Sequence, residues 1–181
     1  MNILLRPWRE TDAAACAALA DDEGVAANLR DVFPHPYTEQ DARDFIALCL
    51  AADPDEALFR AVEVDGAFAG SVTLTCGTDV ARKSAELGYW FGRPFWGKGV
   101  ATEAVRQMCA TGFAEWDIVR IFAEPFSRNR ASCRVLEKNG FQHEGTKRLS
   151  VYKRGKLMDS EMYALTIHNE GVKDDTRLRP R

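Results

Sequence analysis

One strand–helix–strand unit in the middle of the chain constrains the fold more than any other feature. A β-prone run from Ala85 to Phe91 is followed by a glycine-containing loop that ends at Gly97-Lys98-Gly99. Small and apolar residues then recur at helical spacing, at Ala101, Ala104, Val105, Met108 and Gly112. The apolar stretch Ile118 to Phe126 predicts a second, buried strand. Two strands joined through a helix predict a parallel pair.

Hairpins on both sides of this unit make an all-parallel sheet unlikely to fit the chain. Asp65-Gly66 is a strong two-residue turn signal between the β-prone runs Leu58 to Val64 and Ala67 to Thr75. After the unit, Leu149 to Tyr152 and Leu157 to Ile167 predict two final strands. We therefore expect an α/β (α+β) domain with a mixed sheet rather than a doubly wound one.

Capping signals place three shorter helices. Ile3 to Leu5 predicts a first strand, and Thr11-Asp12 then cap an alanine-rich helix that runs to about Ala20. Thr38 and Asp41 form a capping box for a helix through Leu50, whose buried stripe is predicted at Phe45, Leu48 and Cys49. Asn129 to Asn139, closed by Gly140, predicts the third.

Composition limits the class of protein. The 181 residues carry a net charge of −3 and 46% apolar residues, which predicts one soluble domain over residues 1–167 and a polar tail over 168–181. A sequence pI near 5.7 argues against direct nucleic-acid binding. Without a long apolar run or a signal-peptide layout, we expect no membrane association and a cytoplasmic location. Five dispersed cysteines and three histidines predict neither a disulfide framework nor a metal site.

The loop before the long helix admits three explanations from the residues alone. Gly92 to Lys98 fits the start of a Walker A loop, but Gly99 stands where a Ser or Thr should follow. A dinucleotide fingerprint needs Gly or Ala at position 102, where Thr102 stands, although Glu124 ends the next strand at a suitable distance for a ribose ligand. A plain turn that lets strand and helix pack closely is the third possibility.

Several separated motifs, in order, resemble one family. They are Leu5-Arg6-Pro7-Trp8, Glu86-Leu87-Gly88-Tyr89-Trp90, Trp96-Gly97-Lys98-Gly99 with Ala101-Thr102-Glu103-Ala104, Asn129-Arg130-Ala131-Ser132, and Glu137-Lys138-Asn139-Gly140-Phe141. Together they resemble the RimJ/RimL-type (ribosomal-protein-alanine N-acetyltransferase-like) branch of the GNAT superfamily of acyl-CoA N-acyltransferases. The resemblance spans Ile3 to Ile167; Trp96 departs from the superfamily's Gln or Arg. It implies a single domain with a twisted, mixed, mostly antiparallel central sheet and helices on both faces.

The resemblance also implies an activity. It is direct transfer of an acetyl group from acetyl-CoA, as co-substrate, to a primary amine, with a protein N-terminal α-amine of ribosomal type expected as acceptor. Acetylation of a small amine (a polyamine, an antibiotic or a metabolite) and a non-catalytic acyl-CoA-binding module remain the alternatives. No metal is implied, and the protein would act as a monomer or homodimer.

Site residues follow from the matching motifs. Coenzyme A is expected at the pyrophosphate loop and the pantetheine strand, with Asn129 helping: Tyr89, Trp90, Phe91, Gly97, Lys98, Gly99, Val100, Ala101, Thr102 and Asn129. Glu86 or Glu144 is expected to act as general base, and Ser132 to return a proton to the thiolate. Phe33, His35 and Tyr37 are expected to contact the acceptor. Structural roles compete with each assignment: a strand-edge charge for Glu86, a polar loop for Glu144, helix capping for Ser132 and Asn129, and a hydrophobic plug for the aromatic loop.

Overall fold

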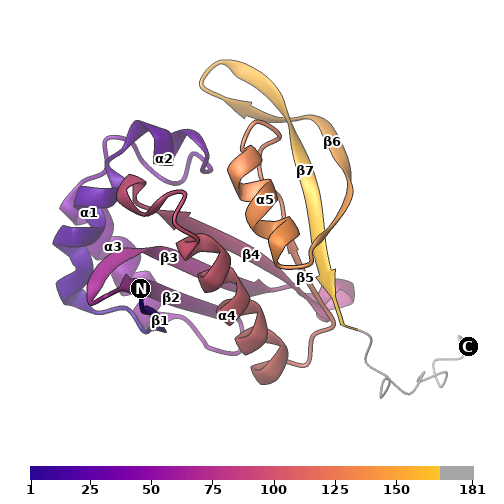
Figure 1. Ribbon diagram of the computed structural model, residues 1–181, viewed down its shortest axis with the longest axis horizontal. Helices are drawn as coiled ribbons and strands as arrows, with labels where there is room; N and C mark the ends of the chain where they lie inside the picture. Colours follow the sequence, from indigo (N-terminus) through magenta and orange to yellow (C-terminus); the bar gives the residue numbers. More distant parts are fainter. Residues whose placement is uncertain (168–181) are drawn as a thin grey trace, which may run out of the picture.

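Seven strands form one open sheet in the computed structural model, which describes residues 1–167 (Figure 1). The strand order is β1-β2-β3-β4-β5-β7-β6. The strands are β1 (Ile3–Arg6), β2 (Ala57–Val64), β3 (Ala67–Cys76), β4 (Ser84–Phe91), β5 (Arg120–Ala123), β6 (Gln142–Lys153) and β7 (Lys156–Thr166). The helices are α1 (Ala13–Ala20), α2 (Glu23–Ala27), α3 (Glu39–Ala51), α4 (Val100–Glu115) and α5 (Arg130–Lys138). The predicted tail, residues 168–181, lies outside the described residues.

The sheet is mixed and mostly antiparallel, as predicted. β4 and β5 form its parallel pair, joined through α4, and the other neighbouring strands pair antiparallel. The Asp65-Gly66 turn lies between β2 and β3, with both residues at positive φ. Hairpins therefore enclose a single crossover, which confirms the predicted fold class.

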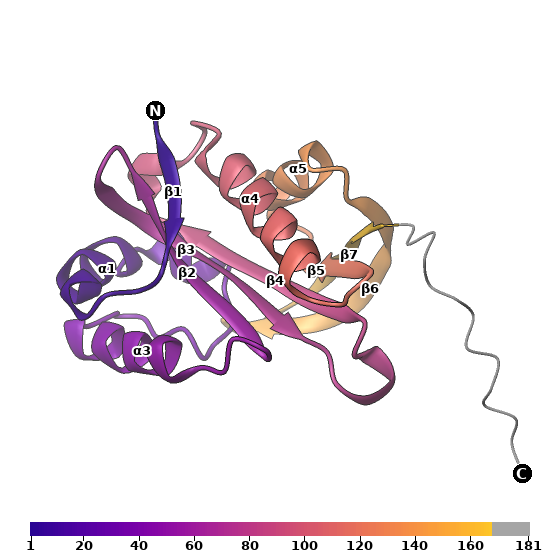
Figure 2. The ribbon, with the colours of Figure 1, turned by 90° about the horizontal axis from the view of Figure 1, so that it is seen from below.

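Helices cover both faces of the sheet. Figure 2 shows α1 and α3 on one face and α4 and α5 on the other. The α1/α3 face buries a core that includes Cys16, Ile46 and Phe68, while the α4/α5 face buries a larger core that includes Met108 and Ile121. Within residues 1–167, no helix is both long and apolar enough to cross a membrane.

The capping box of α3 forms as predicted, but its buried stripe differs. Thr38 Oγ1 accepts from the Asp41 backbone N–H at 3.2 Å, and the Thr38 backbone N–H donates to Asp41 at 2.7 Å. Ala42 and Ile46 are buried, Phe45 and Cys49 are partly buried, and Leu48 is 56% exposed. The prediction for Leu48 was wrong because position 48 lies about 200° around the helix from Ile46, on the solvent side.

Two strand boundaries also differ from the predictions. The strand expected over Ile118 to Phe126 is limited to Arg120–Ala123. Regular pairing with β7 is interrupted near Pro125, which has no N–H to donate, although the Pro125 carbonyl still accepts from the Glu161 N–H at 2.9 Å and Phe126 forms an isolated bridge with Ser160. β6 begins at Gln142 rather than Leu149. The first part of β6 was missed because its sequence is polar and shows no alternation of apolar residues. This edge strand is mostly exposed and has two register shifts.

A buried arginine ties the first strand to the start of the fold. The Arg6 guanidinium donates two hydrogen bonds to Asp12, both at 2.8 Å, and a third to Glu63 at 2.7 Å. The Arg6 and Asp12 side chains are each only 8% exposed. Burial raises the pKa of Asp12, but hydrogen bonds from Arg6 and Arg9 outweigh it and leave that pKa below its usual value.

Candidate active site

The two central strands separate soon after they pair. β4 and β5 are hydrogen-bonded only from Ser84↔Arg120 to Glu86↔Phe122, whereas the opposite edge of β4 pairs with β3 all the way to Phe91. Among the described strands, none pairs with this edge of β4 beyond Glu86. Every second residue of β4 directs its backbone N–H and C=O toward β3, so the remaining groups between Leu87 and Phe91, except the Phe91 carbonyl that accepts from Trp96, are available to an extended ligand between the strands.

The glycine loop lies at the end of β4 and presents an open surface. Gly97 and Gly99 have φ angles of +71° and +81°, and a Cβ added at either would meet no atom of the described residues within 4 Å. Gly99 is the N-cap of the 16-residue helix α4 and makes no side-chain capping hydrogen bond. The first N–H groups of the helix, from Val100 to Thr102, can thus donate to an anion. Lys98 is exposed beside them.

The Walker A explanation does not fit this geometry. A Cβ added at Gly92 would lie 2.8 Å from the Leu19 side chain, so this glycine packs against α1 instead of opening toward a ligand. Trp96 holds the following turn, because its indole N–H donates to the Phe91 carbonyl at 2.7 Å. The anion-binding surface is therefore confined to the end of the loop and the first turn of α4.

Ser132 lies at the start of α5 and faces β4. The Asn129 side chain accepts from the Ser132 backbone N–H at 3.2 Å, so Asn129 caps α5. The Ser132 hydroxyl is 2.7 Å from the Tyr89 hydroxyl. Its neighbour Cys133 is buried, and burial raises the pKa of its thiol. A nucleophilic thiolate at Cys133 is therefore disfavoured.

Glu86 lies on the opposite face of β4 from Tyr89. Residues alternate along a strand. Trp90, which is in the same row as Glu86, packs against the α1/α3 core, while Tyr89 packs against the α4/α5 core. The Glu86 carboxylate is 37% exposed and pairs with the guanidinium of Arg30, which is 70% exposed. Arg30 contacts only the Oε1 atom of Glu86, so the other carboxylate oxygen is available to a substrate amine.

Glu124 is a second carboxylate at this place, and the site prediction did not include it. It lies one residue beyond β5 on the same face as Phe122 and Glu86. It accepts from Ser160 at 2.6 Å and from Lys147 at 2.6 Å. Burial raises its pKa, but these hydrogen bonds and the nearby Arg30 charge outweigh it and leave the pKa lowered. Only the pairing of distant strands brings it to Glu86.

Glu144 lies elsewhere in the sheet. Both of its carboxylate oxygens accept from Arg120, at 2.7 and 2.5 Å, and this bidentate pair lowers its pKa. Arg120 is opposite Ser84, at the paired end of β4 and β5. Glu144 was expected as a general base, with a polar loop as the alternative. It lies instead near the beginning of β6, where its hydrogen bonds are with Arg120 and not with Ser132 or the glycine loop.

The aromatic loop packs across the same face as Glu86. The Phe33 ring stacks on Tyr37 at 4.7 Å and meets Trp90 at 5.7 Å between centroids. Tyr37 is buried, while the His35 Nδ1 is 3.4 Å from Asp21 and its side chain is 33% exposed. Tyr37 thus acts as part of the core, and Phe33 and His35 remain accessible beside it.

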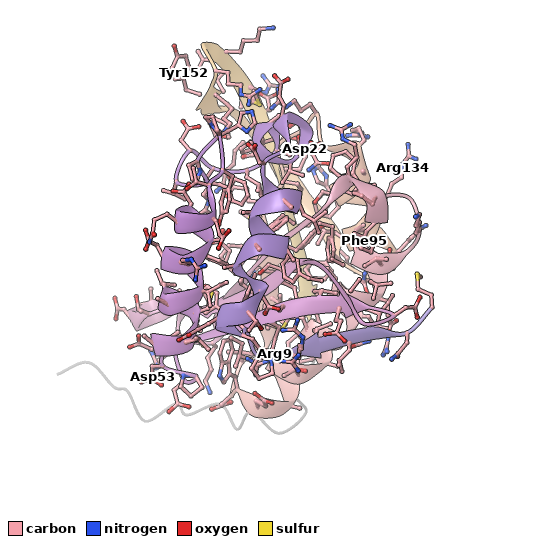
Figure 3. The ribbon with its side chains drawn as sticks, turned by 90° about the vertical axis from the view of Figure 1, so that its left-hand side faces the viewer. Arg9, Asp22, Asp53, Phe95, Arg134 and Tyr152 are labelled. Carbon is pink, nitrogen blue, oxygen red and sulfur yellow. The ribbon has the colours of Figure 1, made fainter. Side chains whose placement is uncertain are left out.

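A strap, defined here as residues 22–31, crosses this face and is held from three sides. Asp22 accepts two hydrogen bonds from Arg93 at 2.8 Å, Asp31 accepts from Lys153 at 2.7 Å, and Glu23 accepts from Arg154 at 2.9 Å. Figures 1 and 3 show α2 and the β6–β7 hairpin at one end of the molecule, where Asp22 and Tyr152 are labelled. Much of the hairpin's basic charge is therefore neutralised within the protein.

No group of three or more His, Cys, Asp or Glu side chains able to hold a metal ion occurs in residues 1–167. The five cysteines are free thiols. The site consists of a separated strand pair, an uncapped helix N-terminus, a serine–tyrosine pair on one face and two carboxylates on the other.

Comparison with known proteins identifies this arrangement. The fold is that of a mixed α/β domain, and the family model described as "Acetyltransferase (GNAT) domain" matches residues 2–142. The chain belongs to this family and is a GNAT N-acetyltransferase. The probable N-acetyltransferase YjcK of Bacillus subtilis (strain 168) is 38% identical over 175 residues, which cover 91% of this chain and 93% of YjcK.

Two solved structures share the fold. Mycobacterium smegmatis RimJ, in complex with a CoA-disulfide, has a TM-score of 0.82 and 28% identity, covering 91% of this chain and 81% of RimJ. RimL, a ribosomal L7/L12 alpha-N-protein acetyltransferase in complex with coenzyme A, has a TM-score of 0.82 and 22% identity, covering 92% and 95%. The predicted family and fold are thereby confirmed.

Proposed function

We propose that the protein transfers the acetyl group of acetyl-CoA directly to the α-amine of a protein N-terminus. The observation that carries the proposal is the opening between β4 and β5, which lies directly beside the uncapped, glycine-led start of α4. Acetyl-CoA has an anionic pyrophosphate, an extended pantetheine arm and a thioester. Those three parts match, in order, a helix N-terminus, a free strand edge and the serine of α5.

The chain's own residues account for binding the co-substrate. The pyrophosphate accepts hydrogen bonds from the backbone of Gly97, Gly99, Val100, Ala101 and Thr102, with Lys98 adding positive charge. Pantetheine follows the free edge of β4 at Tyr89, Trp90 and Phe91. The Cβ-free, open surface at Gly97 and Gly99 supports close approach of a phosphate. Asn129 contributes by fixing the start of α5.

The two catalytic tasks, removing a proton from the amine and stabilising the departing sulfur, fall to residues on opposite faces of β4. Acetyl-CoA supplies the activated acyl group; the attacking amine must lose a proton, and the departing sulfur must be stabilised. Glu86 takes the amine's proton on the face that carries Phe33 and His35. Ser132 faces the sulfur from the other side. We assign the base to Glu86 and not to Glu144, since Arg120 occupies both oxygens of Glu144.

A pooled panel of amines, incubated with acetyl-CoA and the enzyme and followed by mass spectrometry, tests the acceptor class. The panel contains peptides that begin with Ala, Ser and Met, polyamines, aminoglycosides and amino acids. We expect acetylation of a peptide at its α-amine. Acetylation of a small amine alone would overturn the N-terminal assignment, and tight coenzyme A binding without any product would favour a binding module.

Replacing the proposed base should separate the two carboxylates. Glu86→Gln keeps the shape of the side chain but cannot accept a proton, so kcat/KM should fall by about 100-fold or more. Glu144→Gln is the matched control and should leave kcat/KM almost unchanged. Steady-state kinetics on the acceptor from the panel measures both variants, with thermal melting to confirm that each is folded. Equal losses in the two variants would contradict the assignment.

A further inference from the structure

Tyr89 has a contact that binding pantetheine does not require. Its hydroxyl lies 2.7 Å from the Ser132 Oγ and 3.3 Å from the Ser132 backbone carbonyl, across a sequence separation of 43 residues. The ring packs against the α4/α5 core, so the phenol is held in place by β4 while Ser132 is held by the Asn129 cap. Two rigid elements therefore fix one side-chain hydrogen bond.

This contact restrains the serine hydroxyl, and either oxygen can be its donor. A serine hydroxyl has one hydrogen to donate and two lone pairs, and an unrestrained hydroxyl rotates to suit its surroundings. When Tyr89 donates to Oγ, it occupies a lone pair and leaves the Ser132 hydrogen free for another acceptor. Donors in such a chain also polarise one another, which strengthens the outer hydrogen bond.

We infer that Tyr89 is a positioning residue that directs the Ser132 hydroxyl toward the leaving sulfur of coenzyme A. The inference deepens the proposed function and depends on it. In the reaction the amine nitrogen bonds to the acetyl carbon, the carbon–sulfur bond breaks, and the electron pair remains on sulfur as a thiolate. The Ser132 O–H donates to that thiolate, the excess proton on the new amide goes to Glu86, and the thiolate takes its proton from water as it departs.

The state of the phenol distinguishes this role from a proton relay. Burial raises the pKa of Tyr89, and the hydrogen bond with Ser132 only partly offsets that effect. A phenol that resists ionisation is a poor source of a proton for a thiolate, but it stays a donor at every pH at which the enzyme works. Tyr89 therefore orients Ser132 and does not itself ionise.

The thiol of bound coenzyme A provides a direct test that needs no acceptor. Coenzyme A is first shown to bind by fluorescence titration, and its bound thiol is then titrated through the ultraviolet absorbance of the thiolate. A hydrogen bond to a charged group contributes about 1.5–3 kcal/mol, so Ser132→Ala should raise the thiol pKa by about one unit. Tyr89→Phe should also raise the thiol pKa, measured at coenzyme A concentrations that saturate the variant.

A double-mutant cycle then separates positioning from general structural support. If Tyr89 acts through Ser132, the double variant should have the same thiol pKa as Ser132→Ala alone. Tyr163→Phe is the matched control, because this buried tyrosine on the same side of the sheet donates instead to Glu137 at 2.8 Å. It should leave the thiol pKa unchanged.

The outcomes distinguish the inference from the function beneath it. An unchanged thiol pKa in Tyr89→Phe, or a further increase in the double variant, would overturn the positioning role while coenzyme A binding stands. Failure of the wild-type protein to bind coenzyme A would overturn the proposed function itself, and the inference with it.

Discussion

Gly99→Asp should weaken coenzyme A binding by about 100-fold or more while the protein remains folded. The substitution places a carboxylate at the N-cap of α4, where the proposed pyrophosphate lies. Two unit charges 4 Å apart repel by about 4 kcal/mol at an effective dielectric constant of about 20. The fold tolerates the change, because an added Cβ meets nothing within 4 Å and a non-glycine residue at this φ costs only about 1–2 kcal/mol. Fluorescence titration of the four tryptophans with coenzyme A measures the loss.

Gly66→Asp offers a closely matched control. Gly66 also has a positive φ, +87°, and an added Cβ there also meets nothing within 4 Å, but it lies in the β2–β3 turn. Both variants bear the cost of a non-glycine residue in the left-handed region, about 1–2 kcal/mol. Only Gly99→Asp should lose coenzyme A, and a short acetyl thioester without phosphates should be used equally by both. Undiminished affinity in Gly99→Asp would exclude this loop as the phosphate site.

Arg6→Met should destabilise the protein by about 3–5 kcal/mol, because it leaves Asp12 buried without its cation. The Arg6 and Asp12 side chains are each 8% exposed, so water cannot replace the lost hydrogen bonds. Urea unfolding at pH 7 gives the free energy of unfolding. Since the folded pKa of Asp12 is lowered, the wild-type advantage is complete above the unfolded pKa of about 4 and decreases as the pH falls below it.

Arg93→Met provides the comparison for the buried pair. Arg93 also forms a bidentate ion pair with an aspartate, Asp22, but the Arg93 side chain is 58% exposed. Exposed pairs contribute little to stability, so this variant should unfold almost as the wild type does. If both variants were equally stable, burial would not be what makes the Arg6 pair important.

Local signals predicted most of the fold. Asp65-Gly66 predicted the hairpin because few residue pairs adopt positive φ at both turn positions. Thr38 predicted the start of α3 because it forms a hydrogen bond with Asp41, only three residues away. The exposure of Leu48 follows from its position on the solvent side of α3, whereas the first half of β6 escaped prediction because it depends on pairing with β7. A polar edge strand has no local pattern of burial to reveal it.

The candidate site also has parts that the sequence predicts and parts that it does not. The glycine loop and the helix start at Asn129 are each a short continuous segment, so each could be recognised as a motif. The contacts of Glu86 with Arg30, and of Glu124 with Lys147 and Ser160, join residues 23 to 56 positions apart. Such contacts are products of strand order, and no spacing rule predicts them.

The strap joins parts of the chain that are synthesised at different times. Glu23 and Asp31 leave the ribosome 131 and 122 residues before their partners Arg154 and Lys153. A nascent chain can therefore assemble the glycine loop and α4 before the β6–β7 hairpin exists to hold the strap. The ion pairs of Glu23 and Asp31 that hold the strap over the proposed acceptor face can therefore form only after the β6–β7 hairpin has been synthesised.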